Sequence, residues 1–252
     1  MSDLPSTVAL PDPWEALRRR TGARIALGRT GSALPTSALL AFELDHARAR
    51  DAVHRALDVA ALAAALGGSI VQVHSAAADR ATYLLRPDLG RRLDGDSRAR
   101  LAATKPANCD VLFVVADGLS ALGVQSHAAA LIAAVVPKLD GLSIGPVVVA
   151  EQGRVALGDE IGELCAARAV VVVIGERPGL TSPDSIGLYL TFAPKRGRHD
   201  AERNCISNVR PEGLTPQAAA TRLAWLIRAS LQLAISGVAL KDESAPIEAG
   251  SG

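Results

Sequence analysis

Four short runs of apolar, largely β-branched residues alternate along the chain with stretches long enough to form helices. The runs cover residues 69–75, 110–118, 145–153 and 169–176. Because the last three runs contain consecutive apolar residues and not only alternate ones, both faces of the sheet should be buried. The pattern therefore predicts an α/β fold in which helices cover both faces of a doubly wound, mostly parallel, Rossmann-like sheet.

Helices are expected between these strands. The stretches "LSALGVQSHAAALIAAVV" (residues 119–136) and "GDEIGELCAARA" (residues 158–169) separate strand candidates and are rich in helix-forming residues. A fifth apolar run, residues 186–194, is expected to be an edge strand, because Pro194 ends it and proline cannot donate a hydrogen bond to a neighbouring strand.

The last helix has the clearest signals. Thr215 is expected to cap it, Pro216 to lie in its first turn and Gly237 to stop it. One apolar stripe should pack against the sheet, and it consists of Leu223, Leu226, Ile227, Leu231 and Ala234.

A change of composition at Gly67-Gly68 divides the chain. Residues 1–66 are predicted to form a helical N-terminal portion, residues 67–241 the α/β domain and residues 242–252 a flexible tail. In the first portion, residues 35–57 read as one long helix that begins at a Thr-Ser pair. The glycine-rich stretch before it, residues 23–36, is expected to be an ordered loop.

The charge balance argues against large anionic partners. Twenty-seven Lys and Arg face 26 Asp and Glu, and only 3% of the residues are aromatic. The sequence therefore indicates neither the positive electrostatic field that attracts nucleic acid nor a group of aromatic residues on which bases could stack. No segment approaches the roughly 20 apolar residues that a membrane helix needs, and the start lacks the features of a signal peptide. A soluble, cytoplasmic protein without membrane contact is expected.

The motifs of common cofactors and catalysts are missing. Cys109, Cys165 and Cys205 are an odd number at spacings that fit neither a disulfide framework nor a zinc site, so no metal is expected. No G-x-G-x-x-G follows a strand and no phosphate-binding P-loop occurs, which disfavours NAD and ATP. A G-x-S-x-G nucleophile motif is also absent.

Polar residues collect where the predicted strands end. Asp117 ends one strand, Gly153, Arg154 and Val155 follow another, and Glu176-Arg177 ends a third. Ligands of open parallel sheets bind beyond the carboxyl ends of the strands, so these residues are candidates for a ligand site. The simpler interpretation is structural: Asp117 would cap a helix, and Glu176 and Arg177 would form a surface ion pair.

These residues leave three functions open. The chain could be a cofactor-binding enzyme subunit that is inactive alone, or a non-catalytic binding module. It could also be a stand-alone hydrolase or transferase, with Asp117 and Glu176 as acid and base and Cys205 as nucleophile. A buried structural role is the favoured interpretation of Cys205.

Six strings of unusual composition occur in a fixed order, and together they resemble the small subunit, or light chain, of ethanolamine ammonia-lyase. The resemblance covers about residues 13–242. The strings are "ARIALGRTGSALPT", "LLRPDLGRRL", "VVADGLS", "GRVALGDEIGE", "VVVIGERPGL" and "AERNCISNVRPEG".

The resemblance implies a carbon-nitrogen lyase that converts ethanolamine to acetaldehyde and ammonia with adenosylcobalamin as radical source. In this family a large (β/α)₈-barrel subunit carries the substrate site, and large/small pairs assemble into a hexamer. The small subunit supplies no catalytic residue. It holds part of the cobalamin, through positions that match Val155, Glu176 and Cys205 here. Residues 67–241 are therefore expected to be a cobalamin-binding domain.

Two further expectations concern the cofactor's tail and the site of action. The D-x-H-x-x-G signature of enzymes that detach the tail base is missing, so the base should stay on cobalt. Arg177 or the helix opening at Ser120 is expected near the tail phosphate. Some relatives have a longer N-terminal extension associated with bacterial microcompartments, whereas only residues 1–12 precede Pro13 here, so both cytoplasm and microcompartment stay open.

Overall fold

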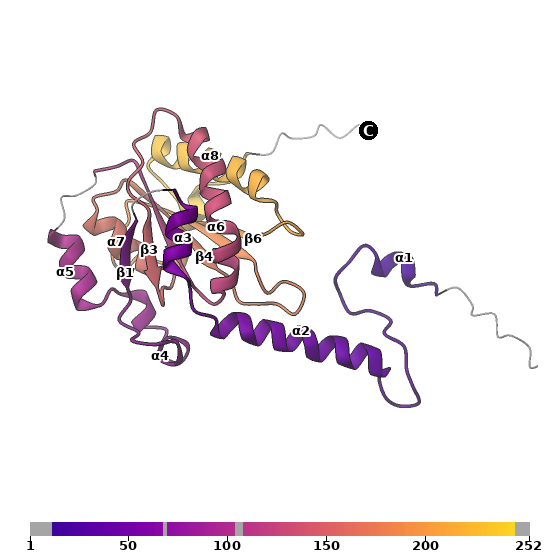
Figure 1. Ribbon diagram of the computed structural model, residues 1–252. Helices are drawn as coiled ribbons and strands as arrows, with labels where there is room; N and C mark the ends of the chain where they lie inside the picture. Colours follow the sequence, from indigo (N-terminus) through magenta and orange to yellow (C-terminus); the bar gives the residue numbers. More distant parts are fainter. Residues whose placement is uncertain (1–11, 68–69, 104–107, 245–252) are drawn as a thin grey trace, which may run out of the picture. The chain divides into compact units, whose positions relative to one another are not determined.

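The computed structural model of the chain describes residues 12–67, 70–103 and 108–244 (Figure 1). Most of the residues expected to be loose ends, 1–11 and 245–252, lie outside these ranges. The chain divides into two compact units, Met1–Ala47 and Arg48–Gly252.

The first unit contains the short helix α1 (Glu15–Arg18) and most of the long helix α2 (Thr36–His54). The segment between them is a loop without a strand, as predicted. Arg24 in this loop forms an ion pair of 2.6 Å with Asp45 of α2, and its guanidinium lies 5.5 Å from the centre of the Phe42 ring.

The second unit is a mixed α/β structure built on one six-stranded sheet of order β1-β3-β2-β4-β5-β6. The first four strands are parallel and coincide with the four runs predicted from the sequence. The last two are antiparallel to their neighbours, so the sheet is mixed. The strands are β1 (Val71–His74), β2 (Val111–Ala116), β3 (Val148–Glu151), β4 (Ala169–Gly175), β5 (Ile186–Phe192) and β6 (Arg203–Val209).

The strand predicted at residues 186–194 is present as β5, but its predicted position at the edge of the sheet was wrong. β5 pairs with β4 on one side and with β6 on the other. Pro194 does not interfere, because the last paired residue of β5 is Phe192. The edge is β6, whose sequence "RNCISNV" lacks an apolar run and buries only Arg203, Ile206 and Val209.

Helices cover both faces of the sheet. On one face, Phe113 and Val171 belong to a core that α6 and α8 complete. On the other, Leu112 and Val172 belong to a second core that includes side chains of α7. Continuous burial of β2 and β4 follows from this double cover. The helices of this unit are α3 (Val59–Ala65), α4 (Arg80–Leu85), α5 (Gly95–Ala103), α6 (Ala121–Val135), α7 (Leu157–Leu164) and α8 (Pro216–Leu233).

The α6 region corrects one expectation about apolar segments. Ala121–Leu139 has 19 residues and a mean hydropathy of 1.3, so by length and composition alone it could cross a membrane. In the structure this helix packs on β4 and α8. Its apolar composition is accounted for by the core that it fills.

α8 begins as predicted and ends earlier. The Thr215 hydroxyl accepts a hydrogen bond of 3.3 Å from the amide of Ala218. The helix stops at Leu233 because Ala234 adopts a left-handed conformation, with φ of 57°. Gly237, the predicted stop, instead opens a short 3₁₀ helix.

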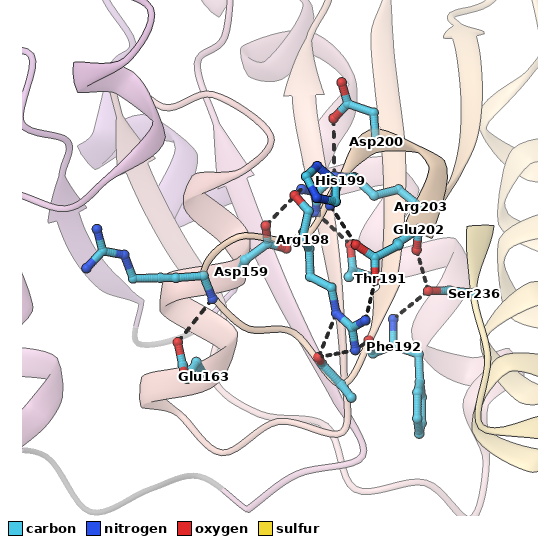
Figure 2. Close-up of polar contacts among 12 residues, drawn as sticks. Asp159, Glu163, Thr191, Phe192, Arg198, His199, Asp200, Glu202, Arg203 and Ser236 are labelled. Atoms are coloured by element: carbon cyan, nitrogen blue, oxygen red, sulfur yellow. Dashed lines mark hydrogen bonds and ion pairs between the residues drawn. The ribbon is translucent and has the colours of Figure 1, made fainter. Parts of the chain in front are cut away.

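A buried ion pair ties α7 to the edge strand (Figure 2). Two nitrogens of the Arg203 guanidinium donate to the two carboxylate oxygens of Asp159, at 2.6 and 2.9 Å. Arg203 also donates to the hydroxyl of Thr191 on β5 and to the backbone oxygen of Arg198. β6 is thereby fixed to the rest of the unit by charge-assisted hydrogen bonds as well as by its pairing with β5.

We expect Asp159→Ala to lower the free energy of unfolding by about 3–5 kcal/mol, because it leaves the Arg203 guanidinium buried and without its main partner. Asp200→Ala is the matched control: the Asp200 side chain is fully exposed and lies 3.5 Å from the same guanidinium. Its loss should cost less than about 1 kcal/mol. Urea unfolding followed by circular dichroism measures both values, and equal effects of the two changes would contradict this account.

Candidate functional site

A cleft of about 750 Å³ opens at the edge where the parallel strands end. Its walls include Val155 from the β3–α7 loop, Glu176 and Arg177 from the end of β4, and Tyr189 from β5. The sequence-based expectation that strand-end residues gather at one edge is met for these residues. The antiparallel pair β5–β6 closes one side of the cleft, which a purely parallel sheet would not provide.

The carboxylate of Asp117 holds the β3–α7 loop in place. It is 3% exposed and accepts hydrogen bonds of 3.0 Å from the backbone amides of both Gln152 and Gly153. Arg80 lies 3.7 Å from it. Asp117 is therefore not the helix cap that the sequence suggested. It anchors the loop that carries Arg154 and Val155 into the cleft.

Ser120 is the residue that caps α6. Its hydroxyl accepts from the amide of Gly123 at 3.2 Å and donates to the backbone oxygen of Pro183 at 2.7 Å. Ser120 is fully buried. The helix start that was expected to meet a phosphate is therefore occupied by protein groups, whereas Arg177, the other candidate, lines the cleft.

Close backbone contact joins the loops after β2 and β4. A side chain at Gly175 would place its Cβ 2.0 Å from the backbone oxygen of Ser120, and Gly118 has φ of +57°. The amide of Leu119 donates to the backbone oxygen of Gly175 at 2.9 Å. Only glycine satisfies both the conformation at Gly118 and the spacing at Gly175, so the floor of the cleft is made of backbone.

The ring of Tyr83 lies between two guanidinium groups. Arg80 and Arg154 lie 4.7 and 4.2 Å from its centre. The Tyr83 hydroxyl donates to the backbone oxygen of Gly153 at 3.2 Å, which adds a second support to the same loop. Burial raises the pKa of Tyr83 to about 12, so the hydroxyl stays a donor at neutral pH.

One carboxylate oxygen of Glu176 accepts a hydrogen bond from the described part of the protein, and the other does not. Its Oε2 accepts from the amide of Asn208 on β6 at 3.1 Å. Its Oε1 has no donor among the described residues and lies over Gly187, whose missing side chain leaves room for it. Glu176 does not pair with Arg177, so the interpretation as a surface ion pair was wrong. The free oxygen can accept a hydrogen bond from a ligand.

Cys205 lies beside the cleft and does not line it. It pairs in register with Tyr189, which does line the cleft. Cys205 is exposed as a residue, so the favoured interpretation as a buried thiol was wrong. Its neighbours still shield the sulfur in part from solvent, and this desolvation, opposed by the Tyr189 hydroxyl, raises the pKa of the thiol, which disfavours a nucleophilic thiolate.

The structure does not assemble the proposed hydrolase site. Asp117 follows β2 and is bonded to the β3–α7 loop, whereas Cys205 lies on β6, with β4 and β5 between them. Within residues 12–67, 70–103 and 108–244, no group of three or more His, Cys, Asp and Glu side chains could hold a metal ion.

Two site residues, Tyr83 and Tyr189, were not identified from the sequence. The stacking of Arg154 on the Tyr83 ring was not predicted either. Tyr83 and Tyr189 are the only two tyrosines in the chain. Both hydroxyls contact residues at the candidate strand ends or at Cys205. The scarcity of tyrosine was the one available signal, because neither residue lies in a recognisable motif.

Fold and site together define a mixed α/β protein with an open cleft at the carboxyl ends of its parallel strands. Comparison with known proteins is more specific. The model of the ethanolamine ammonia-lyase light-chain family matches residues 11–241. The chain belongs to this family.

Relatives named ethanolamine ammonia-lyase small subunit match nearly the whole chain. The protein of Pseudomonas syringae pv. tomato is 54% identical, over 97% of this chain and 88% of its own length. That of Ralstonia nicotianae is 56% identical, over 95% and 92%. That of Bradyrhizobium diazoefficiens is 55% identical, over 92% of each.

Burial of Asp117 generates a prediction about pH. Burial raises the pKa of this carboxyl from 3.8 to about 6, although the amides of Gln152 and Gly153 and the charge of Arg80 oppose the shift. Between pH of about 4 and 6 the folded protein therefore binds more protons than the unfolded chain, and the contribution of Asp117 to stability falls as pH rises through this window. The change amounts to about 3 kcal/mol.

The measurement is urea unfolding of the wild type and of Asp117→Asn at pH 4, 5, 6 and 7. The wild type should lose about 3 kcal/mol relative to the variant between the lowest and highest pH. A carbon-13 carboxyl titration of Asp117 should show its midpoint near 6. A midpoint near 4 with a pH-independent difference would contradict the assignment.

Proposed function

We propose that this chain is the small subunit of an adenosylcobalamin-dependent ethanolamine ammonia-lyase and that residues 67–241 hold part of the cobalamin against a large (β/α)₈-barrel subunit. Family membership supports the lyase assignment. The cleft at the carboxyl edge carries the cofactor proposal, because two of the three positions expected to contact cobalamin, Val155 and Glu176, line it together. The third, Cys205, is the cross-strand partner of Tyr189, another lining residue.

The cleft residues fit the chemistry of a corrinoid. A corrinoid is a broad, largely apolar disc fringed by amides, and it needs acceptors for its amide N–H groups and apolar contact for its ring. Glu176 offers a carboxylate oxygen that no described donor occupies, and Val155 is half-buried with its side chain at the cleft. The exposed Cys205 lies next to Tyr189 at the same wall.

The shape of the site accounts for a separate subunit. The cleft is open on one side, so it can cover one part of a large cofactor while a second protein surface covers the rest. When bound, adenosylcobalamin supplies an adenosyl radical for the conversion of ethanolamine to acetaldehyde and ammonia. The residues of this chain bind and orient the cofactor and help to exclude water, and we assign no catalytic residue among them.

Assembly and location follow as further parts of the proposal. We infer a hexamer of large/small pairs in the cytoplasm or in a bacterial microcompartment, with ethanolamine bound by the large subunit.

The doubly wound arrangement applies to the four parallel strands, and the ligand lies beyond their carboxyl ends as in other open sheets. A binding module without cobalamin is the alternative, and the next experiment separates the two.

Co-expression of this chain with a large subunit should give a stable complex on gel filtration and cobalamin-dependent release of acetaldehyde. The complex should show no activity without cobalamin, and the isolated chain none with it, because it lacks an assembled catalytic group. A complex that forms but neither binds cobalamin nor releases acetaldehyde in its presence would favour the binding module. Absence of both complex and activity would reject the proposal.

Glu176→Gln tests the role of the free carboxylate oxygen. The amide can still accept from the backbone of Asn208, but it presents a donor to the ligand where the carboxylate presented an acceptor. We expect cobalamin to bind about 10- to 100-fold more weakly to the assembled complex, as measured by equilibrium dialysis. Glu163→Gln, on α7 and outside the cleft lining, is the matched control and should bind as the wild type does.

A further inference from the structure

A second, smaller pocket adjoins the cleft behind Val155. Its volume is about 280 Å³, and it shares Val155 and Arg154 with the main cleft. A ligand that contacts Val155 from the cleft therefore lies at the entrance of this side pocket. The pocket is rich in arginine, since its lining includes Arg91, Arg154, Arg198 and Arg203 beside His199, with Asp200 as the single carboxylate.

Two of these cations are already neutralised and form the wall. Arg203 is held by Asp159, and Arg198 forms an ion pair with Glu202 (Figure 2). Arg198 also donates to the backbone oxygens of Phe192 and Ala193. Arg198, on the loop before β6, and Arg203, at the start of β6, are thus fixed by internal contacts, and their charges are matched by protein carboxylates.

Arg154 and Arg91 have no carboxylate partner among the described residues. The guanidinium of Arg154 stacks on the Tyr83 ring and donates from Nη2 to the Tyr83 backbone oxygen at 3.2 Å. Its Nε is buried and without a hydrogen-bond partner in the part of the chain that the structure describes. The charge of Arg154 is therefore not neutralised by a carboxylate of the described residues, and several of its N–H groups can donate to a ligand. The guanidinium is held in position before a ligand binds.

The backbone around Arg154 is arranged to hold that position. Its amide donates to the backbone oxygen of Gly90 at 2.8 Å, and a Cβ at Gly90 would lie 2.9 Å from Cγ of Arg154. Glycine is required there for the arginine to lie against the short 3₁₀ helix Leu89–Arg91. That helix also presents Arg91 to the same pocket.

We propose that the side pocket binds a phosphodiester, namely that of the cobalamin nucleotide tail, through Arg91 and Arg154. The inference rests on the proposed function. Planar guanidinium groups match phosphate oxygens, and α7, which begins beside the pocket, has no side-chain cap of its own. Arg177 was the cation expected there from the sequence. It is exposed and has no stacking or hydrogen-bonding contact among the described residues, so its ordering on binding would cost more entropy.

The experiment compares two ligands on the assembled complex: cobalamin, and cobinamide, which lacks the nucleotide tail and its phosphodiester. Affinities are measured by equilibrium dialysis for the wild type, Arg91→Ala and Arg154→Ala. We expect each variant to bind cobalamin about tenfold or more weakly and cobinamide as the wild type does. Arg154→Lys should recover part of the loss because it keeps the charge. Arg92→Ala, next along the chain and outside the pocket lining, is the matched control.

Each other outcome overturns the inference in a distinguishable way. Equal losses for both ligands would show that the arginines act on the fold of the cleft and not on the tail. Unchanged cobalamin affinity, or a tail-dependent loss confined to Arg177→Ala, would place the phosphodiester elsewhere. Arg91-dependent binding of inorganic phosphate that leaves cobalamin affinity untouched would mean a free-anion site. If the wild-type complex binds neither corrinoid, the proposed function itself fails.

Discussion

The burial of one carboxylate, that of Asp117, determines the shape of the ligand-facing edge. Asp117 follows the central strand β2, and its two oxygens bind the amides of Gln152 and Gly153 in the next loop. A buried carboxylate is costly unless backbone donors or a cation satisfy it, and here both do. These contacts fix the β3–α7 loop. Arg154 and Val155 belong to this loop, so their positions are fixed with it. The main cleft and its side pocket therefore share one anchor.

The antiparallel strands give the site its second wall. In a sheet of parallel strands only, the edge beyond β4 would end in solvent. β5 and β6 extend it, bring the amide of Asn208 to the Oε2 of Glu176 and place Cys205 opposite Tyr189. The Arg203–Asp159 pair connects this extension to α7, on the same side of the sheet as Val155. Residues widely separated in the sequence thus meet around one opening.

The buried parallel strands could be predicted from the sequence. The edge strand β6 and the polar contacts around the cleft could not. The runs that became β2, β3 and β4 contain consecutive apolar residues, so their existence and parallel pairing could be predicted from the sequence. β6 was missed because "RNCISNV" alternates irregularly and owes its place to pairing and to one buried arginine. Strand-end candidates such as Glu176 were found because topology alone brings such positions together. The role of Asp117 depended on which loop packs over it, and the stacking of Arg154 on Tyr83 joins residues 71 positions apart. No local pattern records contacts of that kind.

The distribution of charge fits the proposed role in holding a ligand. Arg198 and Arg203 are matched by carboxylates, the pKa of the Cys205 thiol is raised, and the Tyr83 hydroxyl is bonded to backbone. Among the described residues, one oxygen of Glu176 at the cleft and the Nε of Arg154 keep unused hydrogen-bonding capacity, and both residues line the cleft with Val155. An acceptor, an apolar contact and a cation in that combination suit a ligand with amide donors, an apolar body and an anionic group. Such a ligand gains affinity because these groups are already positioned before it arrives.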